Sequence, residues 1–286
     1  MKDFIKIKNI KDFNLTHIFE CGQCFRWYRE EDGSYTGVVF NRVINISQEK
    51  GDLIIKNTNG EDFEGIWRSY FDLDRDYGSI KMKLSEKDDI MGATTEFGQG
   101  IRLLNQEPWE TLISFIISQN RNIPTIKKNI EKISEKYGSY LGNYNTKDYY
   151  AFPSPEMLAD TSIDSLAECG VGYRAKYIIS AAQMASTKSD FLSTGQLTDE
   201  ELEQHLLSIH GVGPKVANCI MLFGMKRYKR FPIDVWIERV MKELYGLENK
   251  IQVQRYADEN FKDLGGFAQQ YLFYYAREKK IGQKKK

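Results

Sequence analysis

The sequence predicts an α+β fold, in which an N-terminal antiparallel β-sheet domain is followed by an all-helical domain built around a helix-hairpin-helix. Short β-rich runs bounded by turn residues are concentrated before about residue 95. Helix starts followed by apolar stripes dominate after it. A glycine-containing turn, Ile209-His-Gly-Val-Gly-Pro-Lys215, joins two helical patterns in the second half of the chain.

Composition is typical of a globular protein with substantial cores. The chain has 286 residues, of which 41% are apolar and 28% are charged. The formal net charge is zero and the pI is about 6.8, so any attraction to a nucleic acid has to come from local basic patches such as residues 226–230. We expect a β-containing domain over residues 1–95, a helical domain over 96–277 and a basic tail over 278–286.

The N-terminal domain is expected to contain strands at residues 35–40, 42–47 and 53–57. Gly33, Asn41 and the pair Gly51-Asp52 supply the turns that separate these runs. The segment Met91-Gly-Ala-Thr-Thr is the expected junction between the domains, with the final helix packing back across it. Further on, helices are expected to start at Pro108, at Pro124 and at Ser154-Pro155, because proline is favoured in the first turn of a helix.

The helix-hairpin-helix follows from local signals. Thr198 and Glu201 form a capping-box pattern, which predicts a helix from about Asp199 to Ser208. Gly211 and Gly213 are expected to adopt positive φ in a sharp reversal, and Pro214 is suited to the first position of the second helix. Such a turn can direct backbone N–H groups at a phosphate, or the carbonyls of Leu207, Ile209 and Val212 at a monovalent cation that bridges to one.

Lys215 and Asp234 are the candidate catalytic pair. Lys215 falls in the first turn of the second helix, where the positive end of the macrodipole disfavours an ammonium, and a neutral amine is a nucleophile. Cys219 lies one turn further on the same face, whereas Val216, Ile220 and Phe223 are expected to face the core. Asp234 stands before another helical pattern, so it is also a candidate N-cap. Taken singly, each residue has an ordinary structural explanation, and only the joint pattern favours a site.

Several segments of the chain, taken together, resemble a known family. The chain is similar to the 8-oxoguanine DNA glycosylase/lyase branch of the helix-hairpin-helix DNA glycosylase superfamily, of the eukaryotic type that some bacteria also carry. The resemblance covers nearly the whole chain and is carried by five ordered blocks: Gly22-Gln-Cys-Phe-Arg-Trp27, residues 109–123, Gly170-Val-Gly-Tyr-Arg-Ala-Lys-Tyr177, the hairpin with Pro232-Ile-Asp234-Val, and Gly266-Phe-Ala-Gln-Gln-Tyr-Leu-Phe273.

The resemblance implies roles for the catalytic and base-binding residues. Lys215 matches the lysine that attacks the sugar C1′ and holds the sugar as a Schiff base, and Asp234 matches the aspartate that stabilises positive charge on the sugar. Cys219 and Phe273 match the residues that sandwich the extruded base, and Gln269 matches the reader of its Watson–Crick edge. The carbonyl of Gly22 matches the acceptor for the N7–H that 8-oxoguanine has and guanine lacks, since an acceptor facing bare N7 would remain unpaired.

Base extrusion also implies residues that contact the rest of the duplex. Asn120 matches the asparagine that fills the vacated gap, and Tyr173 with Arg174 matches the pair that wedges beside the abandoned cytosine and contacts it. Two positions depart from the family pattern. Thr125 replaces a second cytosine-reading arginine, and Trp236 replaces a phosphate-contacting histidine, so a preference for cytosine opposite the lesion does not follow from the resemblance.

The resemblance implies an enzyme that needs no redox cofactor and no catalytic metal, with oxidised-guanine-containing double-stranded DNA as its partner. The four cysteines are scattered, so neither a disulfide framework nor an iron–sulfur cluster is expected. The N-terminus lacks a signal-peptide pattern and no apolar run is long enough to span a membrane. We therefore expect a monomer without membrane association, cytoplasmic and nucleoid-associated if the source is bacterial.

Two alternatives remain at the level of the sequence. An alkylated-purine glycosylase would share the layout and the aspartate but use water as nucleophile, which Lys215 and Gln269 argue against. A non-catalytic helix-hairpin-helix module would bind damaged DNA with a strong salt dependence and release no base.

Overall fold

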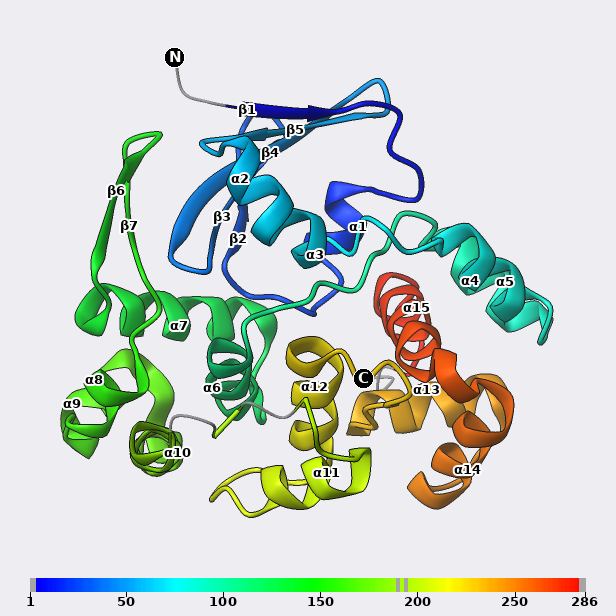
Figure 1. The fold of residues 1–286 in the computed structure, drawn as a ribbon. Coiled ribbons are helices and arrows are strands. Elements are labelled where there is room, and N and C mark those ends of the chain that lie inside the picture. Colours follow the sequence, from blue (N-terminus) through cyan, green and yellow to red (C-terminus); the bar gives the residue numbers. More distant parts are fainter. Residues whose placement is uncertain (1–3, 189–190, 193–194, 283–286) are drawn as a thin grey trace.

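A computed structural model describes residues 4–188, 191–192 and 195–282 (Figure 1). An antiparallel five-stranded sheet lies at one end of the molecule and helices make up most of the remainder, so the predicted fold class is confirmed. The strand order is β1-β5-β4-β3-β2. The strands are β1 (Phe4–Ile7), β2 (Trp27–Arg29), β3 (Tyr35–Val39), β4 (Arg42–Glu49) and β5 (Asp52–Lys56).

The three strands expected from the sequence, β3 to β5, form the middle of this sheet. Phe40 and Asn41 both have positive φ between β3 and β4, as a tight two-residue hairpin turn requires, and Val39 consequently pairs with Arg42. The two outermost strands were not anticipated from the sequence. Both are short, and β1 alternates only between exposed and half-buried residues, so their composition carries little strand signal.

The helical part is larger than the sheet. Its principal helices are α4 (Tyr77–Ser85), α5 (Asp89–Phe97), α6 (Pro108–Ser118), α7 (Ile123–Tyr137), α8 (Pro155–Ala159), α9 (Ile163–Leu166), α10 (Ala175–Thr187), α11 (Asp199–Leu207), α12 (Pro214–Met225), α13 (Val235–Tyr245), α14 (Lys250–Asn260) and α15 (Gly265–Glu278). Short helical segments complete it: α1 (Leu15–Phe19), α2 (Gly60–Asp62), η1 (Phe63–Trp67), α3 (Arg68–Tyr70), η2 (Ala167–Val171), η3 (Gly172–Arg174) and η4 (Lys262–Leu264). Helices α6, α7 and α8 begin at or beside the expected prolines.

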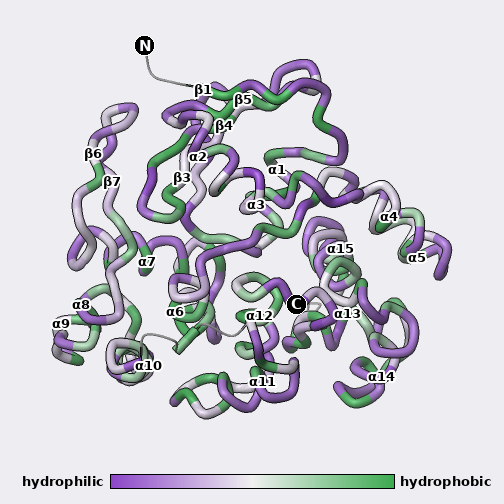
Figure 2. Tube along the Cα trace, viewed as in Figure 1, coloured by the Kyte–Doolittle hydropathy of each residue, from purple (hydrophilic) through white to green (hydrophobic). Residues whose placement is uncertain are grey.

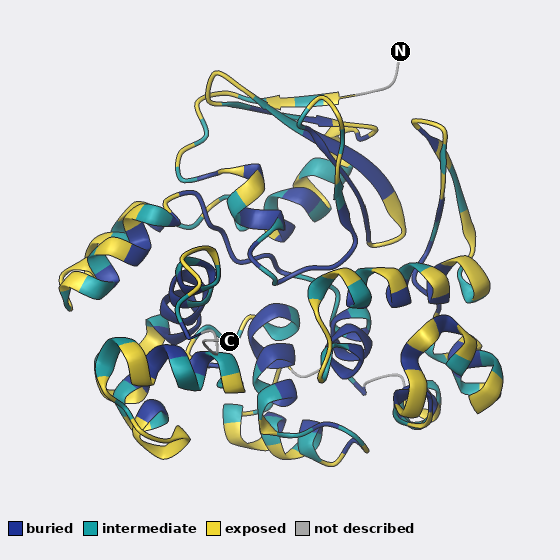
Figure 3. Cartoon of the chain, turned by 180° about the vertical axis from the view of Figure 1, so that it is seen from behind, coloured by how far each residue is buried: buried dark blue, intermediate teal, exposed yellow. Residues whose placement is uncertain are grey.

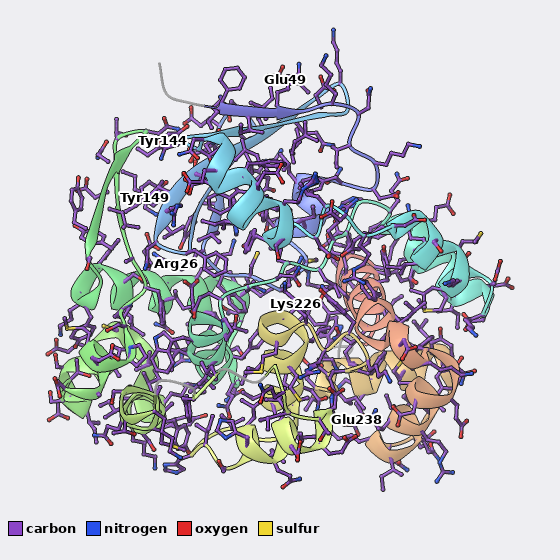
Figure 4. All side chains as sticks on the ribbon, in the orientation of Figure 1. Arg26, Glu49, Tyr144, Tyr149, Lys226 and Glu238 are labelled. Atoms are coloured by element: carbon purple, nitrogen blue, oxygen red, sulfur yellow. The ribbon has the colours of Figure 1, made fainter. Side chains whose placement is uncertain are left out.

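A β-hairpin interrupts the second part of the chain, which the sequence led us to expect as all-helical. Strands β6 (Tyr140–Tyr144) and β7 (Lys147–Tyr150) extend from the end of α7 toward the N-terminal sheet. Figure 4 labels Tyr144 and Tyr149 on this hairpin, where they form a small buried cluster with Val38 and Val43 of the sheet. The hairpin therefore joins the two parts of the molecule.

Two large apolar cores underlie the fold, and the boundary between them does not coincide with the domain boundary expected near residue 95. One core lies beneath the sheet and contains Trp27, Tyr35 and Ile44, all nearly inaccessible to solvent. The other unites the helices and includes residues of α4 and Met91 of α5, which lies within the expected junction. Figure 2 marks apolar residues in green and Figure 3 marks buried residues in dark blue, and both kinds recur along the elements of these two cores. The segment 91–95 is thus a helical, packed part of the molecule.

The helix-hairpin-helix consists of α11, the turn at residues 208–213, and α12. Thr198 and Glu201 form the reciprocal capping box, and Pro214 occupies the first turn of α12, as predicted. Gly211 has φ +90°, and a Cβ there would lie 2.4 Å from the Tyr177 ring, so glycine is required. The expectation for Gly213 was wrong: its φ is −99°, because it is the extended N-cap of α12 rather than part of the reversal.

No helix in the described residues combines the length and the hydropathy needed to cross a membrane.

Candidate active site

A cavity lies where α6, α12, α15 and the loop after α1 meet. Its open space, including the solvent-facing mouth, is about 630 Å³. Lys215, Asp234, Gly22, Cys219, Gln269 and Phe273, which are six of the sequence-predicted residues, all line it. They come from four separate segments of the chain, so the fold brings together residues that the sequence had assigned to one site.

Lys215 and Asp234 line the same cavity, and each stands at the start of a helix. Lys215 is half-buried in the first turn of α12, and its Nζ lies 5.3 Å from the centre of the Phe115 ring. Asp234 is the N-cap of α13, where its Oδ1 accepts a hydrogen bond from Ile237 N at 2.7 Å. This bond uses one carboxylate oxygen, and the carboxylate still lines the cavity. The N-cap prediction is confirmed and is compatible with a second role.

Apolar and aromatic groups form the walls. Cys219 is buried, and burial raises the pKa of its thiol while Lys215 partly opposes that shift, so the side chain stays a neutral, polarisable surface near neutral pH. Phe273 lines the cavity from α15. Phe115 and Phe223 stack in parallel with ring centres 5.5 Å apart, and both line the cavity. Phe223, which was expected only in the core, therefore belongs both to the core and to the cavity wall.

Gln269 presents an unsatisfied polar group to this otherwise apolar space. The residue is 6% exposed, and its Oε1 has no hydrogen-bond partner among the residues that the structure describes. A buried carbonyl oxygen without a partner costs on the order of 1–3 kcal/mol, so such a group in a cavity is suited to pair with a ligand. Gln269 Oε1 is therefore available to accept a hydrogen bond from a ligand in this cavity.

Gly22 lies at the mouth of the cavity in a conformation that favours glycine. Its φ is +87°, and a Cβ would lie 3.1 Å from Phe273 Cε1 and 3.4 Å from Ile123 Cδ1. The backbone can approach a ligand closely here because no side chain intervenes.

The predicted DNA-contacting residues gather beside the cavity. Asn120 follows α6 with φ +51° and is exposed, and the preceding Gln119 donates from Nε2 to the carbonyl of Gly211 in the hairpin turn at 3.0 Å. Tyr173 is 55% exposed. Arg174 differs from a surface arginine because it is only 2% exposed and donates to the carbonyls of Gln119 and Val171 beneath Tyr173. Its guanidinium thus holds the segment before Asn120 in the described conformation.

The hairpin turn shares this surface. Gly213, Lys215, Gln119 and Asn120 line one groove, and nothing lies within 4 Å of a Cβ added to Gly213, so a bulky anion has space to approach its backbone. Of the carbonyls suggested for a monovalent cation, that of Leu207 ends α11 and those of Ile209 and Val212 lie in the turn. The carbonyl of Ile209 also accepts a hydrogen bond from Val212 N at 3.0 Å.

The two positions that depart from the family pattern are also located. Thr125 is half-buried in the first turn of α7, and its backbone N–H is bound by the Asn122 side chain. Trp236 lines a groove with Asp234 and Phe273, and its Nε1–H, buried, has no partner among the described residues. It therefore keeps a free donor where the family usually has a histidine.

Several lining residues were not singled out from the sequence. Arg121 and Ile123 border the cavity immediately after Asn120, and Phe25, Phe115 and Gln270 contribute from within or beside the quoted blocks. Their position next to predicted residues was the available signal. An aromatic or amide side chain in a buried helix gives no sequence sign of whether it faces a core or a cavity.

Comparison with known protein families gives matches over most of the chain. Residues 5–112 match the model described as 8-oxoguanine DNA glycosylase, N-terminal domain, and residues 113–263 match the HhH-GPD superfamily base excision DNA repair protein. A Saccharomyces cerevisiae protein named N-glycosylase/DNA lyase is 30% identical, with the alignment covering 83% of this chain and 69% of that protein.

Solved structures are also similar along nearly the full length. The Clostridium acetobutylicum 8-oxoguanine glycosylase/lyase, in complex with double-stranded DNA containing cytosine opposite 8-oxoguanine, is 43% identical with a TM-score of 0.93 and covers 98% of this chain and 97% of its own. MBOgg1, bound to a low-affinity DNA ligand, is 48% identical with a TM-score of 0.94 and covers 97% and 96%, respectively.

Proposed function

This chain belongs to the 8-oxoguanine DNA glycosylase/lyase family of helix-hairpin-helix base excision repair proteins, and from that premise we propose which of its side chains carry out the reaction. The family activity is excision of 8-oxoguanine from DNA followed by strand cleavage. The observation that carries the assignment to residues is one cavity lined by an amine, a carboxylate, an unsatisfied amide oxygen and an unobstructed glycine backbone.

Lys215 is the nucleophile of this proposal. Its amine attacks C1′ of the deoxyribose as the glycosidic bond breaks, and the base leaves with the bonding electrons. Asp234 stabilises the positive charge that develops on the sugar. The secondary amine then forms an imine at C1′ with opening of the sugar ring, and loss of a C2′ proton expels the 3′ phosphate. No metal is used in these steps.

The cavity accounts for base selection. Cys219 and Phe273 offer apolar surfaces to the faces of a purine, and Gln269 offers its free Oε1 to the Watson–Crick edge. The carbonyl of Gly22 accepts the N7–H of 8-oxoguanine. Guanine has a bare acceptor at N7, so the same carbonyl would remain unpaired against it.

We expect Gly22→Ala to reduce excision of 8-oxoguanine by roughly tenfold to a hundredfold, because the methyl group crowds Phe273 and the positive φ is strained. Gly33→Ala is the matched control, since Gly33 has φ +81° but nothing within 4 Å of an added Cβ. Single-turnover excision rates measure the effect. Equal losses in the two variants would show that backbone strain alone, and not the cavity, is responsible.

Contacts with the duplex are proposed for the surface beside the cavity. Asn120 enters the gap left by the extruded base, and Tyr173 wedges beside that gap. Arg174 gives up its hydrogen bonds to the carbonyls of Gln119 and Val171 and contacts the abandoned cytosine instead. The hairpin turn with Gly211 and Gly213 holds a phosphate, directly or through a monovalent cation on the carbonyls of Leu207, Ile209 and Val212. We propose that the protein acts on DNA as a monomer.

Thr125 is proposed to relax the preference for cytosine opposite the lesion, because its short side chain cannot make the two-pronged contact of an arginine. Thr125→Arg should therefore raise the ratio of excision opposite cytosine to excision opposite adenine, by on the order of tenfold. Excision assays on the two duplexes measure that ratio. If the natural protein already favours cytosine as strongly as the variant does, Thr125 has no such role.

Incubation with a duplex containing one 8-oxoguanine tests the function as a whole. A glycosylase/lyase shortens the lesion strand without added base treatment. A glycosylase that uses water leaves an abasic site, which is cleaved only after alkali. A DNA-binding module shifts the duplex in a gel and changes neither strand. Lys215 and Gln269 in the cavity favour the first outcome over the second.

A further inference from the structure

Side-chain amides donate hydrogen bonds to the backbone carbonyls of the residues on both sides of Gly22. Gln270 Nε2 donates to the carbonyl of Cys21 at 2.8 Å, and this bond is buried. Gln106 Nε2 donates to the carbonyl of Gln23 at 2.7 Å. Arg277 holds the carbonyl of Glu20 one residue earlier. Among the described residues, none donates a hydrogen bond to the carbonyl of Gly22 itself.

This pattern restricts a backbone position that would otherwise be free to rotate. Glycine has wide access to φ and ψ, so its carbonyl direction is weakly determined by its own residue. The Cys21 carbonyl anchors the peptide group before Gly22, and the Gln23 carbonyl anchors the peptide group after Gln23, so the φ and ψ rotations of Gly22 and Gln23 between them are restricted together. The Gly22 carbonyl, which accepts no bond from the described residues, therefore lies between two anchored peptide groups in a residue that lines the cavity.

Helix α15 supplies two neighbouring glutamines to this arrangement. Gln269 keeps its Oε1 free in the cavity, whereas Gln270 is 2% exposed and uses its amide on Cys21. Successive residues of an α-helix point about 100° apart, so one rigid turn can direct one amide at the ligand and the next at the loop. The distance between the group that meets the Watson–Crick edge and the group that meets N7 is then set by a single helix.

We propose that Gln270 is a positioning residue for lesion recognition, which holds the Gly22 carbonyl in register with Gln269 through its bond to the Cys21 carbonyl. The inference rests on the acceptor role proposed for Gly22. Gln270 contacts the loop rather than the reacting atoms, so its loss should affect recognition of the base and spare the chemistry on the sugar.

A preformed abasic site separates those two effects, because it requires Lys215 and Asp234 but presents no base. Gln270→Met removes the donor with little change in volume. It should lower the ratio of excision of 8-oxoguanine to excision of its 7-deaza analogue, which has CH2 in place of N7–H, by about tenfold, equal to about 1.4 kcal/mol. Borohydride trapping on the abasic duplex should stay within about twofold of the natural protein, because the lost bond contributes to selection and not to attack on C1′.

Two further variants separate an effect on positioning from an effect on stability. Gln106→Met removes the bond on the other side of Gly22 and should lower the same ratio, which keeps the test valid if Gln270→Met folds poorly. Asn45→Leu removes a buried amide that donates to Ser34 and Thr36 within the sheet, and it should leave both the ratio and the trapping unchanged.

The results distinguish the inference from its premise. If the natural protein excises the 7-deaza analogue as fast as 8-oxoguanine, the acceptor role of Gly22 is wrong and the inference fails with it. If the natural protein discriminates but Gln270→Met keeps the same ratio, Gln270 has no positioning role. Excision and trapping that decline together, in step with the unfolding midpoint, would equally overturn the proposal in favour of a general contribution to folding.

Discussion

Lys215→Gln should abolish covalent trapping by borohydride on a duplex containing 8-oxoguanine. Glutamine has nearly the length of the lysine but no nucleophilic amine, so no imine forms for the reductant to capture. Excision itself should slow by at least about a thousandfold, which corresponds to roughly 4 kcal/mol in activation free energy. The adduct is measured as a protein band that migrates with labelled DNA.

The control for this experiment is Lys132→Gln, which removes an exposed lysine on α7 that does not line the cavity and should trap as efficiently as the natural protein. Equal trapping by Lys215→Gln would mean that another amine attacks the sugar. Binding of the lesion duplex should survive the substitution, since the cavity walls and the hairpin turn are unchanged. A variant that neither binds nor traps would instead indicate a disturbed helix start.

Asp234→Asn should reduce excision by about a hundredfold to a thousandfold without a comparable loss of stability. Asn and Asp are nearly equivalent as N-caps, so the bond from Ile237 N, 2.7 Å in the natural protein, can be kept while the negative charge is removed. The charge is what stabilises the developing sugar cation. Single-turnover excision and the free energy of unfolding measure the two properties separately.

Asp234→Ala removes both functions, so it should show the same loss of activity and an additional destabilisation of about 1 kcal/mol. Asp76 provides the matched comparison, because it caps α4 through Ser79 N at 3.0 Å and lies outside the cavity. Asp76→Ala should cost similar stability and leave excision unchanged. Full activity in Asp234→Asn would reduce Asp234 to a helix cap.

Local signals in the sequence determined much of the fold and of the candidate site. The capping box of Thr198 and Glu201, Pro214 at the start of α12 and the N-cap Asp234 depend on atoms within a few residues of one another, so residue type alone predicts them. The same holds for Asn41 as a turn residue and for the three strands β3 to β5, whereas Phe40, expected in the strand, takes positive φ in the turn. The six expected cavity residues were named from motifs, which carry residue identity but no distances.

Tertiary structure alone decided how those residues are held. The Cys21–Gln270 bond joins positions 249 residues apart, and the Gln23–Gln106 bond joins positions 83 apart, so no periodicity or local propensity signals them. Burial of Arg174 under Tyr173 and the hairpin β6–β7 against the sheet likewise depend on which surfaces meet. The backbone of Gly213 is extended because it is the N-cap of α12, although glycine also permits the positive φ that was expected there. Sequence patterns specify what each segment can do locally, and packing between distant segments selects which of those options is used.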